Sequence, residues 1–212
     1  MDIKTCYYCY DKPVFQSSIE IIRCYNGAKY KNSWFLMKKY IFKWEVYGII
    51  FVFLVGALLH FVFEWSGNSS IVGAIASVNE SVWEHFKQGF WPMCLFAAIE
   101  HRFIRSNTSN FLAAKGTAVL LIPIITGLVF YAYTAITGTE ILIVDILIFL
   151  LAVTVGQMIS YKIMTLSSLP KLTNYAGIAV ILLIGLILIT FTYYPPHWPI
   201  LLDKNTMIYG IA

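Results

Sequence analysis

Hydrophobic positions gather in five long stretches along the chain, and polar residues rich in Gly, Ser, Asn and Pro separate them. Stretches of about 20 apolar residues can cross a hydrocarbon core of about 30 Å as helices. The pattern predicts an all-α integral membrane protein, a five-helix transmembrane bundle. The expected helices cover residues 46–65, 81–104, 117–136, 141–161 and 175–194.

The second stretch differs from the other four because its apolar core, Gly89 to Ile99, is too short to span a membrane alone. A spanning helix must therefore include Glu84, His85, Lys87 and Gln88 in its outer part. The alternative is a short re-entrant or tilted segment packed inside the bundle.

Composition and charge support a membrane protein. The chain is 59% hydrophobic and 12% charged, whereas soluble domains have about 25% charged residues. Lys and Arg, although they give a net charge of +4, gather at or before Lys43 and in alternate connections. This distribution predicts a cytoplasmic N-terminus, an outer C-terminus and a place in the cell membrane, with no nucleic-acid partner.

Residues 1–36 are polar and rich in Tyr, and the membrane domain is expected at residues 37–212. Two explanations of residues 1–36 remain open. Met37 begins a basic flank followed by an apolar run, so the first 36 residues can be an over-extended gene start. They can equally form a cytoplasmic arm with one helical piece near residues 17–25.

Ionisable side chains gather at one predicted membrane depth near the outer surface. His60 lies about 7 Å below the interfacial Trp65, at about 1.5 Å per helical residue. Ionisable groups at membrane depth are costly and often functional. The group comprises His60, Glu64, Glu80, Glu84, His85 and Asp145, with His197 and Asp203 in the tail.

Helical spacing gives these side chains a direction. Glu64 lies one turn after His60, and the same face continues inward through Gly56, Val52 and Gly48. Small residues mark packing faces in membranes, so this face should point into the bundle. We therefore expect His60 to approach His85 across the first two helices.

Local features of the second helix are also predicted. Asn79 or Ser77 should cap its start. Pro92 removes the helical partner of the Gln88 carbonyl, and a kink there would widen the space behind Glu84 and His85.

Structural explanations exist for most of these residues. Glu80 suits the first turn of a helix, and Glu84 can pair with Lys87 or Gln88. Asp145 lies inside an apolar helix and needs a partner. Glu100 is expected to pair with His101, Arg102 or Arg105.

The preferred function is that of a metal-dependent hydrolase embedded in the membrane, acting on a lipid or lipid-linked substrate. A catalytic zinc takes three protein ligands and keeps one position open for water. Candidate catalytic residues are Glu84, Glu80 and Asp145. Candidate metal ligands are His60, His85, Glu64 and Asp203, with zinc as the preferred divalent metal.

Two other functions fit the same residues. The first is a proton- or cation-coupled transporter, in which a homodimer would supply the symmetry that five helices lack. The second is a non-catalytic membrane scaffold or partner protein.

From Met37 to Ala212 the chain resembles an uncharacterised family of small bacterial multipass membrane proteins, a domain of unknown function. The resemblance rests on MKKYIFKWE, LLHFVFEWSGN, NESVWEHFKQGFWP and the tail TYYPPHWPILLDKNTMIYGI. It implies a multipass membrane fold and no established activity.

Overall fold

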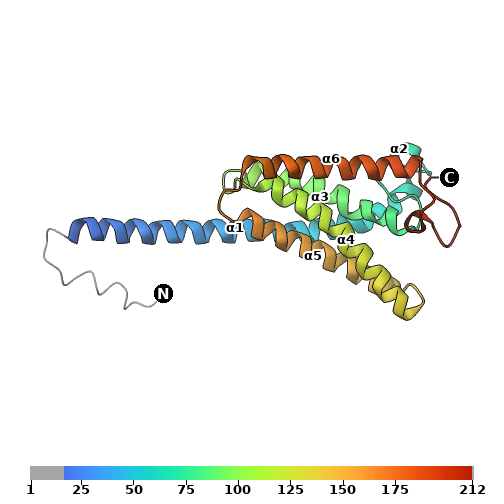
Figure 1. The fold of residues 1–212 in the computed structure, drawn as a ribbon, viewed down its shortest axis with the longest axis horizontal. Helices are drawn as coiled ribbons and strands as arrows, with labels where there is room; N and C mark the ends of the chain where they lie inside the picture. The colour runs from blue at the N-terminus through green and yellow to red at the C-terminus, as the bar shows by residue number, and fades with distance from the viewer. Residues whose placement is uncertain (1–16, 212) are drawn as a thin grey trace. The chain divides into compact units, whose positions relative to one another are not determined.

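The computed structural model describes the backbone of residues 17–211 and the side chains of residues 34–211. The chain divides into two units, residues 1–40 and 41–212, and the second unit contains the helical bundle. The elements are α1 (Ser17–Trp65), α2 (Ser70–Gly73), α3 (Val82–Ile104), α4 (Phe111–Thr137), α5 (Leu142–Met164), α6 (Lys171–Tyr193) and the short 3-10 helix η3 (Pro199–Leu201), as Figure 1 shows.

Four of these helices are long and apolar enough to cross a membrane: α4, α5, α6 and the Trp34–Trp65 part of α1. The predicted all-α membrane class is confirmed, and no strand occurs among residues 17–211. The 23-residue α3 is about 34 Å long at about 1.5 Å per residue, but it is not among these four. Five spans and the direction of the termini therefore stay predictions.

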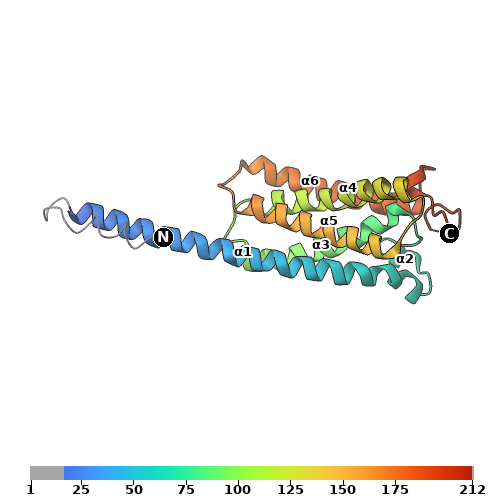
Figure 2. The same cartoon turned by 90° about the horizontal axis from the view of Figure 1, so that it is seen from below.

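Helix α3 lies within the bundle rather than at its edge. It packs against α4 and α6, and α4 also lies along α5 and α6 (Figure 2). The buried core joins side chains of five helices, including Val52 of α1, Phe90 of α3, Ile122 of α4, Val153 of α5 and Leu188 of α6. This central place explains why α3 has to be less apolar than its neighbours, since it contacts protein more than lipid.

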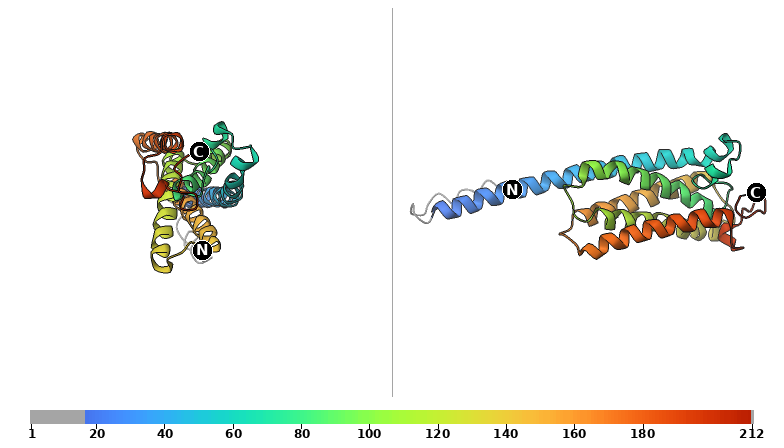
Figure 3. Two further views of the ribbon diagram at one scale, coloured as in Figure 1. Left: turned by 90° about the vertical axis from the view of Figure 1, so that its right-hand side faces the viewer. Right: turned by 90° about the horizontal axis from the view of Figure 1, so that it is seen from above.

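The hairpin of α4 and α5 diverges from α6 at the end where α4 finishes (Figure 1; Figure 3, left). Pro123 lies inside α4 where it lines an apolar groove of about 490 Å³ between α3, α4 and α6. The groove's α3 wall is Trp83, Phe86 and Phe90, and these side chains do not include His85.

The packing face predicted for α1 is confirmed, because Gly48, Val52 and Gly56 are all buried. A Cβ atom at Gly56 would lie 2.4 Å from the backbone oxygen of Gln88. This is the carbonyl that Pro92 leaves without a helical donor. Helix α1 therefore approaches α3 closely at this carbonyl, and a wider space behind Glu84 and His85 stays a prediction.

Replacing Gly56 by Leu should destabilise the protein, because the new side chain overlaps both the Gln88 carbonyl and the Phe149 ring. We expect a loss of about 1–3 kcal/mol in the free energy of unfolding, measured by denaturant titration in detergent. The exposed neighbour Ala57 provides the matched control, Ala57→Leu. Equal stability of the two variants would contradict the close packing of α1 on α3.

Candidate metal centre at the ends of α1 and α3

Three side chains converge where α1 ends and α3 begins. His60 comes from α1, Glu80 from the connection before α3, and His85 from the start of α3. One potential ligand atom of each lies within 4.8 Å of the other two, the only such group among the described residues. The ring centroids of His60 and His85 are 5.3 Å apart, which confirms their predicted approach.

Glu80 lies between the two imidazoles. Its Oε1 is 3.5 Å from Nε2 of His60, and its Oε2 is 3.5 Å from Nε2 of His85. The hydrogen bond from His85 is the main cause that lowers the pKa of Glu80 below its ordinary value. The carboxylate is therefore ionised at neutral pH. About half of this side chain is exposed, so the group is open on one side.

The second ring nitrogen of His85 determines what its Nε2 can do. Nδ1 lies 2.8 Å from the carbonyl oxygen of Ser81, and the carbonyl can only accept. With a proton on Nδ1, Nε2 either carries the second proton of an imidazolium, which donates to the Glu80 oxygen, or in the neutral ring is a lone pair directed at that oxygen. In the neutral ring a metal ion can take the place of this proton between Nε2 and Glu80.

Gln88 sets the tautomer of His60 in the opposite sense. Its amide nitrogen lies 3.1 Å from Nδ1 of His60 and also donates to Oγ of Ser77. Accepting this bond leaves the His60 proton on Nε2, facing Glu80. Rotating the amide by 180° would bring its oxygen to Nδ1 and free Nε2 as a ligand.

A buried ion pair fixes the connection that carries Glu80. Nζ of Lys87 lies 2.6 Å from Oε2 of Glu84, which confirms the predicted pairing. The same ammonium group donates to the carbonyl oxygens of Gly73 and Ala76 at 2.8 and 3.2 Å. Glu84 in turn accepts from the backbone N–H of Val78. Both ends of residues 73–78 are thus tied to α3.

The start of α3 is capped by Ser81, whose hydroxyl accepts from the backbone N–H of Glu84. The prediction that Asn79 or Ser77 caps this helix is wrong. Asn79 accepts from the N–H of Ser81 and donates to the carbonyl of Gly210, while Ser77 donates to the carbonyl of Glu84. The two expected caps hold the connection to its neighbours instead.

Asp203 supports Glu80 from the tail. Its Oδ2 lies 3.4 Å from the backbone nitrogen of Glu80 and accepts from the hydroxyl of Thr206. Burial acts to raise the pKa of Asp203, but its hydrogen bonds, including one from Asn205, outweigh burial and lower it. Asp203 therefore remains an anion that positions Glu80 through the backbone and lies outside the group of three.

Glu84, Glu64 and Asp145 also lie outside this group. The Glu84 side chain is engaged by Lys87, and that of Glu64 is exposed. Asp145 accepts from the Tyr133 hydroxyl at 2.5 Å, and this hydroxyl accepts from the backbone N–H of Ile141. Asp145 thus closes the connection between α4 and α5.

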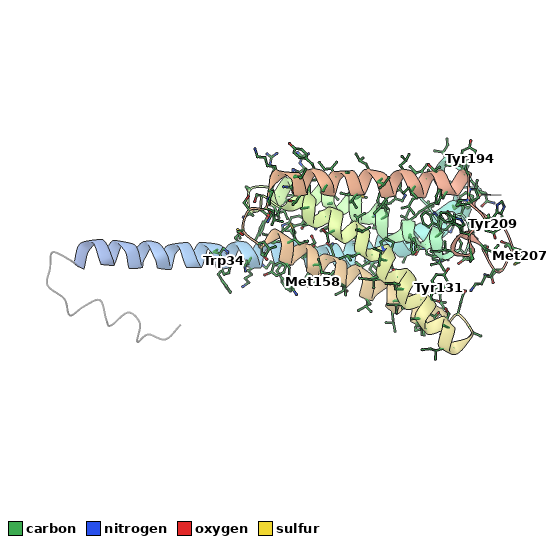
Figure 4. All side chains as sticks on the ribbon, viewed as in Figure 1. Trp34, Tyr131, Met158, Tyr194, Met207 and Tyr209 are labelled. Atoms are coloured by element: carbon green, nitrogen blue, oxygen red, sulfur yellow. The ribbon has the colours of Figure 1, made fainter. Side chains whose placement is uncertain are left out.

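The tail lies beyond the end of α6, where Figure 4 labels Tyr194, Met207 and Tyr209, and Asp203 brings it to Glu80. Here the ring of His197 packs against that of Tyr209, with centroids 4.7 Å apart. His197 is therefore occupied by a packing contact.

Glu100 does not pair with His101, Arg102 or Arg105 as predicted. This side chain is fully buried and lies 2.6 Å from Nζ of Lys115 on α4, whereas His101, Arg102 and Arg105 are exposed. The reason is rotation, because Glu100 is on the face of α3 that meets α4. Lys115 lay just outside the predicted helix 117–136, whereas α4 begins at Phe111 and includes it.

The sequence profile of a family of unknown function, DUF6512, matches residues 34–211. The chain belongs to this family. The match confirms the resemblance, and it includes every residue of the group of three and its supports. No curated protein and no solved structure matches the chain.

Breaking the pair of Lys87 and Glu84 should be strongly destabilising, because the remaining charge would be buried without a partner. We expect Lys87→Met to cost about 3–5 kcal/mol in the free energy of unfolding, and the double variant with Glu84→Leu to cost less than the sum of the single changes. The exposed pair of Lys204 and Glu140 serves as control, with less than about 1 kcal/mol expected for Lys204→Met. Similar losses at both pairs would contradict the anchoring role.

Proposed function

We propose that His60, Glu80 and His85 bind one divalent cation, preferably zinc, and that the protein is a metal-dependent hydrolase of a lipid or lipid-linked substrate at the outer membrane surface. The observation that carries this proposal is the convergence of two imidazoles and an ionised carboxylate within 4.8 Å. Nε2 of His85, which faces Glu80, can exchange its proton for a metal ion.

The spacing of these atoms suits a tetrahedral ion. Ligands about 2.0–2.1 Å from a tetrahedral zinc are about 3.3 Å from one another. Both imidazoles are 3.5 Å from a Glu80 oxygen before any ion is considered. Two His and one Glu form a ligand set that zinc hydrolases use, with the fourth position left for water.

The proposed hydrolysis needs few groups besides the three metal ligands. A bound divalent ion lowers the pKa of its water to about 7, so that hydroxide forms at neutral pH. An ion held by His60, Glu80 and His85 would thus activate water toward an ester carbonyl carbon or a phosphorus, and the proton that the water loses would pass to the leaving oxygen. Glu80 acts here as a ligand, while Glu84 and Asp203 hold the connection that presents it.

The substrate class follows from what surrounds the group. Phe61 and Trp65, exposed by 47% and 69%, stack on each other at the end of α1. The Phe61 ring also contacts the His60 ring edge-on at 4.9 Å. Aromatic side chains at the end of a spanning helix are typical of the headgroup region. A lipid could thus keep its chains in the bilayer while its headgroup reaches the metal.

Metal content tests the binding site directly. Full-length protein purified in detergent without chelator and supplied with zinc should hold about one ion per chain by elemental mass spectrometry. The His60→Ala, His85→Ala double variant should hold almost none, because it keeps only one of three ligands. Glu64→Gln, which changes an exposed carboxylate one turn away, should keep the ion. Absence of bound metal in the wild type, or equal content in the double variant, would overturn the site.

Hydrolysis is tested separately with vesicles that contain fluorescent ester and phosphate analogues of lipids. The zinc-loaded protein should release the headgroup or acyl product, and Glu80→Gln should reduce this rate by at least about 100-fold, as expected for loss of a ligand or activating group. If metal binds with the expected stoichiometry and no lipid is cleaved, the hydrolase is wrong and the metal site stands.

A further inference from the structure

A second polar cluster lies deep in the bundle, away from the group of three. Its members are fully buried and come from four helices. Glu45 precedes His60 by 15 residues, which is about 22 Å along a helix at about 1.5 Å per residue. The members are Glu45 of α1, Glu100 of α3, Lys115 of α4, and Gln157 and Ser160 of α5.

The carboxylate of Glu45 is saturated with donors. Nζ of Lys115 lies 3.0 Å from each of its two oxygens. The hydroxyl of Ser160 donates to Oε1 at 2.7 Å. An ionised carboxylate is an acceptor only, so this environment suits a negative Glu45.

Glu100 has a different environment. Its Oε2 lies 2.6 Å from Nζ of Lys115, but neither Oε1 nor Oε2 has a well-oriented hydrogen-bond partner in the part of the chain that the structure describes. The amide nitrogen of Gln157 also lacks a partner there, although its oxygen lies 3.3 Å from Lys115. Unpartnered polar atoms in a closed interior indicate that the cluster holds something more than the side chains themselves.

The formal charges of the side chains in this cluster do not cancel without one further positive charge. Two carboxylates face a single ammonium group, and the other contacts are neutral: Gln157, Ser160 and the Phe111 ring, 5.6 Å from Nζ. With both carboxylates ionised, the cluster would carry a net charge of −1 with no exposed atom, which is strongly unfavourable. One bound proton removes this charge.

We propose that this cluster is a proton-binding site in which Glu100 holds one exchangeable proton while Glu45 and Lys115 remain an ion pair. The proposal is independent of the metal centre. Because every side chain of the site is closed to solvent, proton release requires separation of the helices that meet there, α1 among them. The site therefore couples protonation to the packing of the bundle.

The chain contains a matched control in the pair of Glu84 and Lys87. This pair is also buried, but it holds one carboxylate for one ammonium group and needs no proton to be neutral. The two clusters thus differ in charge balance more than in burial.

Infrared spectroscopy of the full chain in lipid vesicles detects a protonated carboxyl group through its carbonyl stretching band. At neutral pH the wild type should show this band. Both Glu100→Gln and Glu45→Gln should lose it, since one carboxylate then balances Lys115. Lys115→Met should roughly double it, because both acids become neutral, and Glu84→Gln should leave it unchanged. Absence of the band in the wild type, or its persistence in both Gln variants, would overturn the proposal.

The free energy of unfolding provides a second test of the proton. It compares only the wild type with Glu100→Gln, so it does not depend on whether Lys115→Met folds. Above the ordinary Glu pKa of about 4.3, the folded wild type keeps a proton that the unfolded chain releases, so its stability falls as pH rises. The unfolding equilibrium constant of the wild type, relative to that of Glu100→Gln, should rise about tenfold per pH unit. A ratio that is constant with pH would contradict proton binding.

Discussion

A charge inside an apolar helical bundle has to be balanced within the bundle, and this constraint explains most of the structure. Helix α3 carries four buried polar side chains: Glu84, Lys87, Gln88 and Glu100. Every one of them is contacted by another element of the chain. Water cannot satisfy them, so the apolar helices must surround α3 in one arrangement. The pairing requirement, more than the hydrophobic effect, selects this arrangement among apolar helices of similar length.

At one end of the bundle the same constraint builds the candidate metal centre. Lys87 and Glu84 neutralise each other and together hold residues 73–78, while Asp203 holds the backbone of Glu80. Glu80 is thereby presented between two imidazoles that come from different helices. The groups around Glu80 have their partners, whereas Glu80 and the two imidazoles can share either protons or a metal ion.

In the cluster of Glu45, Glu100 and Lys115, deeper in the bundle, the charges of the side chains alone do not cancel. Two carboxylates share Lys115, and neither oxygen of Glu100 has a hydrogen-bond partner among the described residues. A metal ion suits the first cluster because two imidazoles meet one carboxylate there and one side is open. A proton suits the second because the ammonium group already occupies the centre and the site is closed.

Much of the fold could be predicted from the sequence. Apolar runs located the helices, and the spacing of Gly48, Val52 and Gly56 gave the face of α1 that carries His60 inward. The pairing of Lys115 with Glu45 and Glu100 could not be predicted, because it joins residues as far as 70 positions apart and depends on how each helix is rotated. The role of Asp203 was equally hidden, since the tail has no regular pattern that fixes its path.

The most direct test of this account is X-ray absorption spectroscopy at the zinc edge on the zinc-loaded, full-length protein. Two imidazole nitrogens at about 2.0–2.1 Å and one or more oxygen ligands are predicted, with the imidazole signal lost in the His60→Ala, His85→Ala variant. A shell of oxygen atoms alone, or the same imidazole signal in that variant, would contradict the metal centre at the ends of α1 and α3.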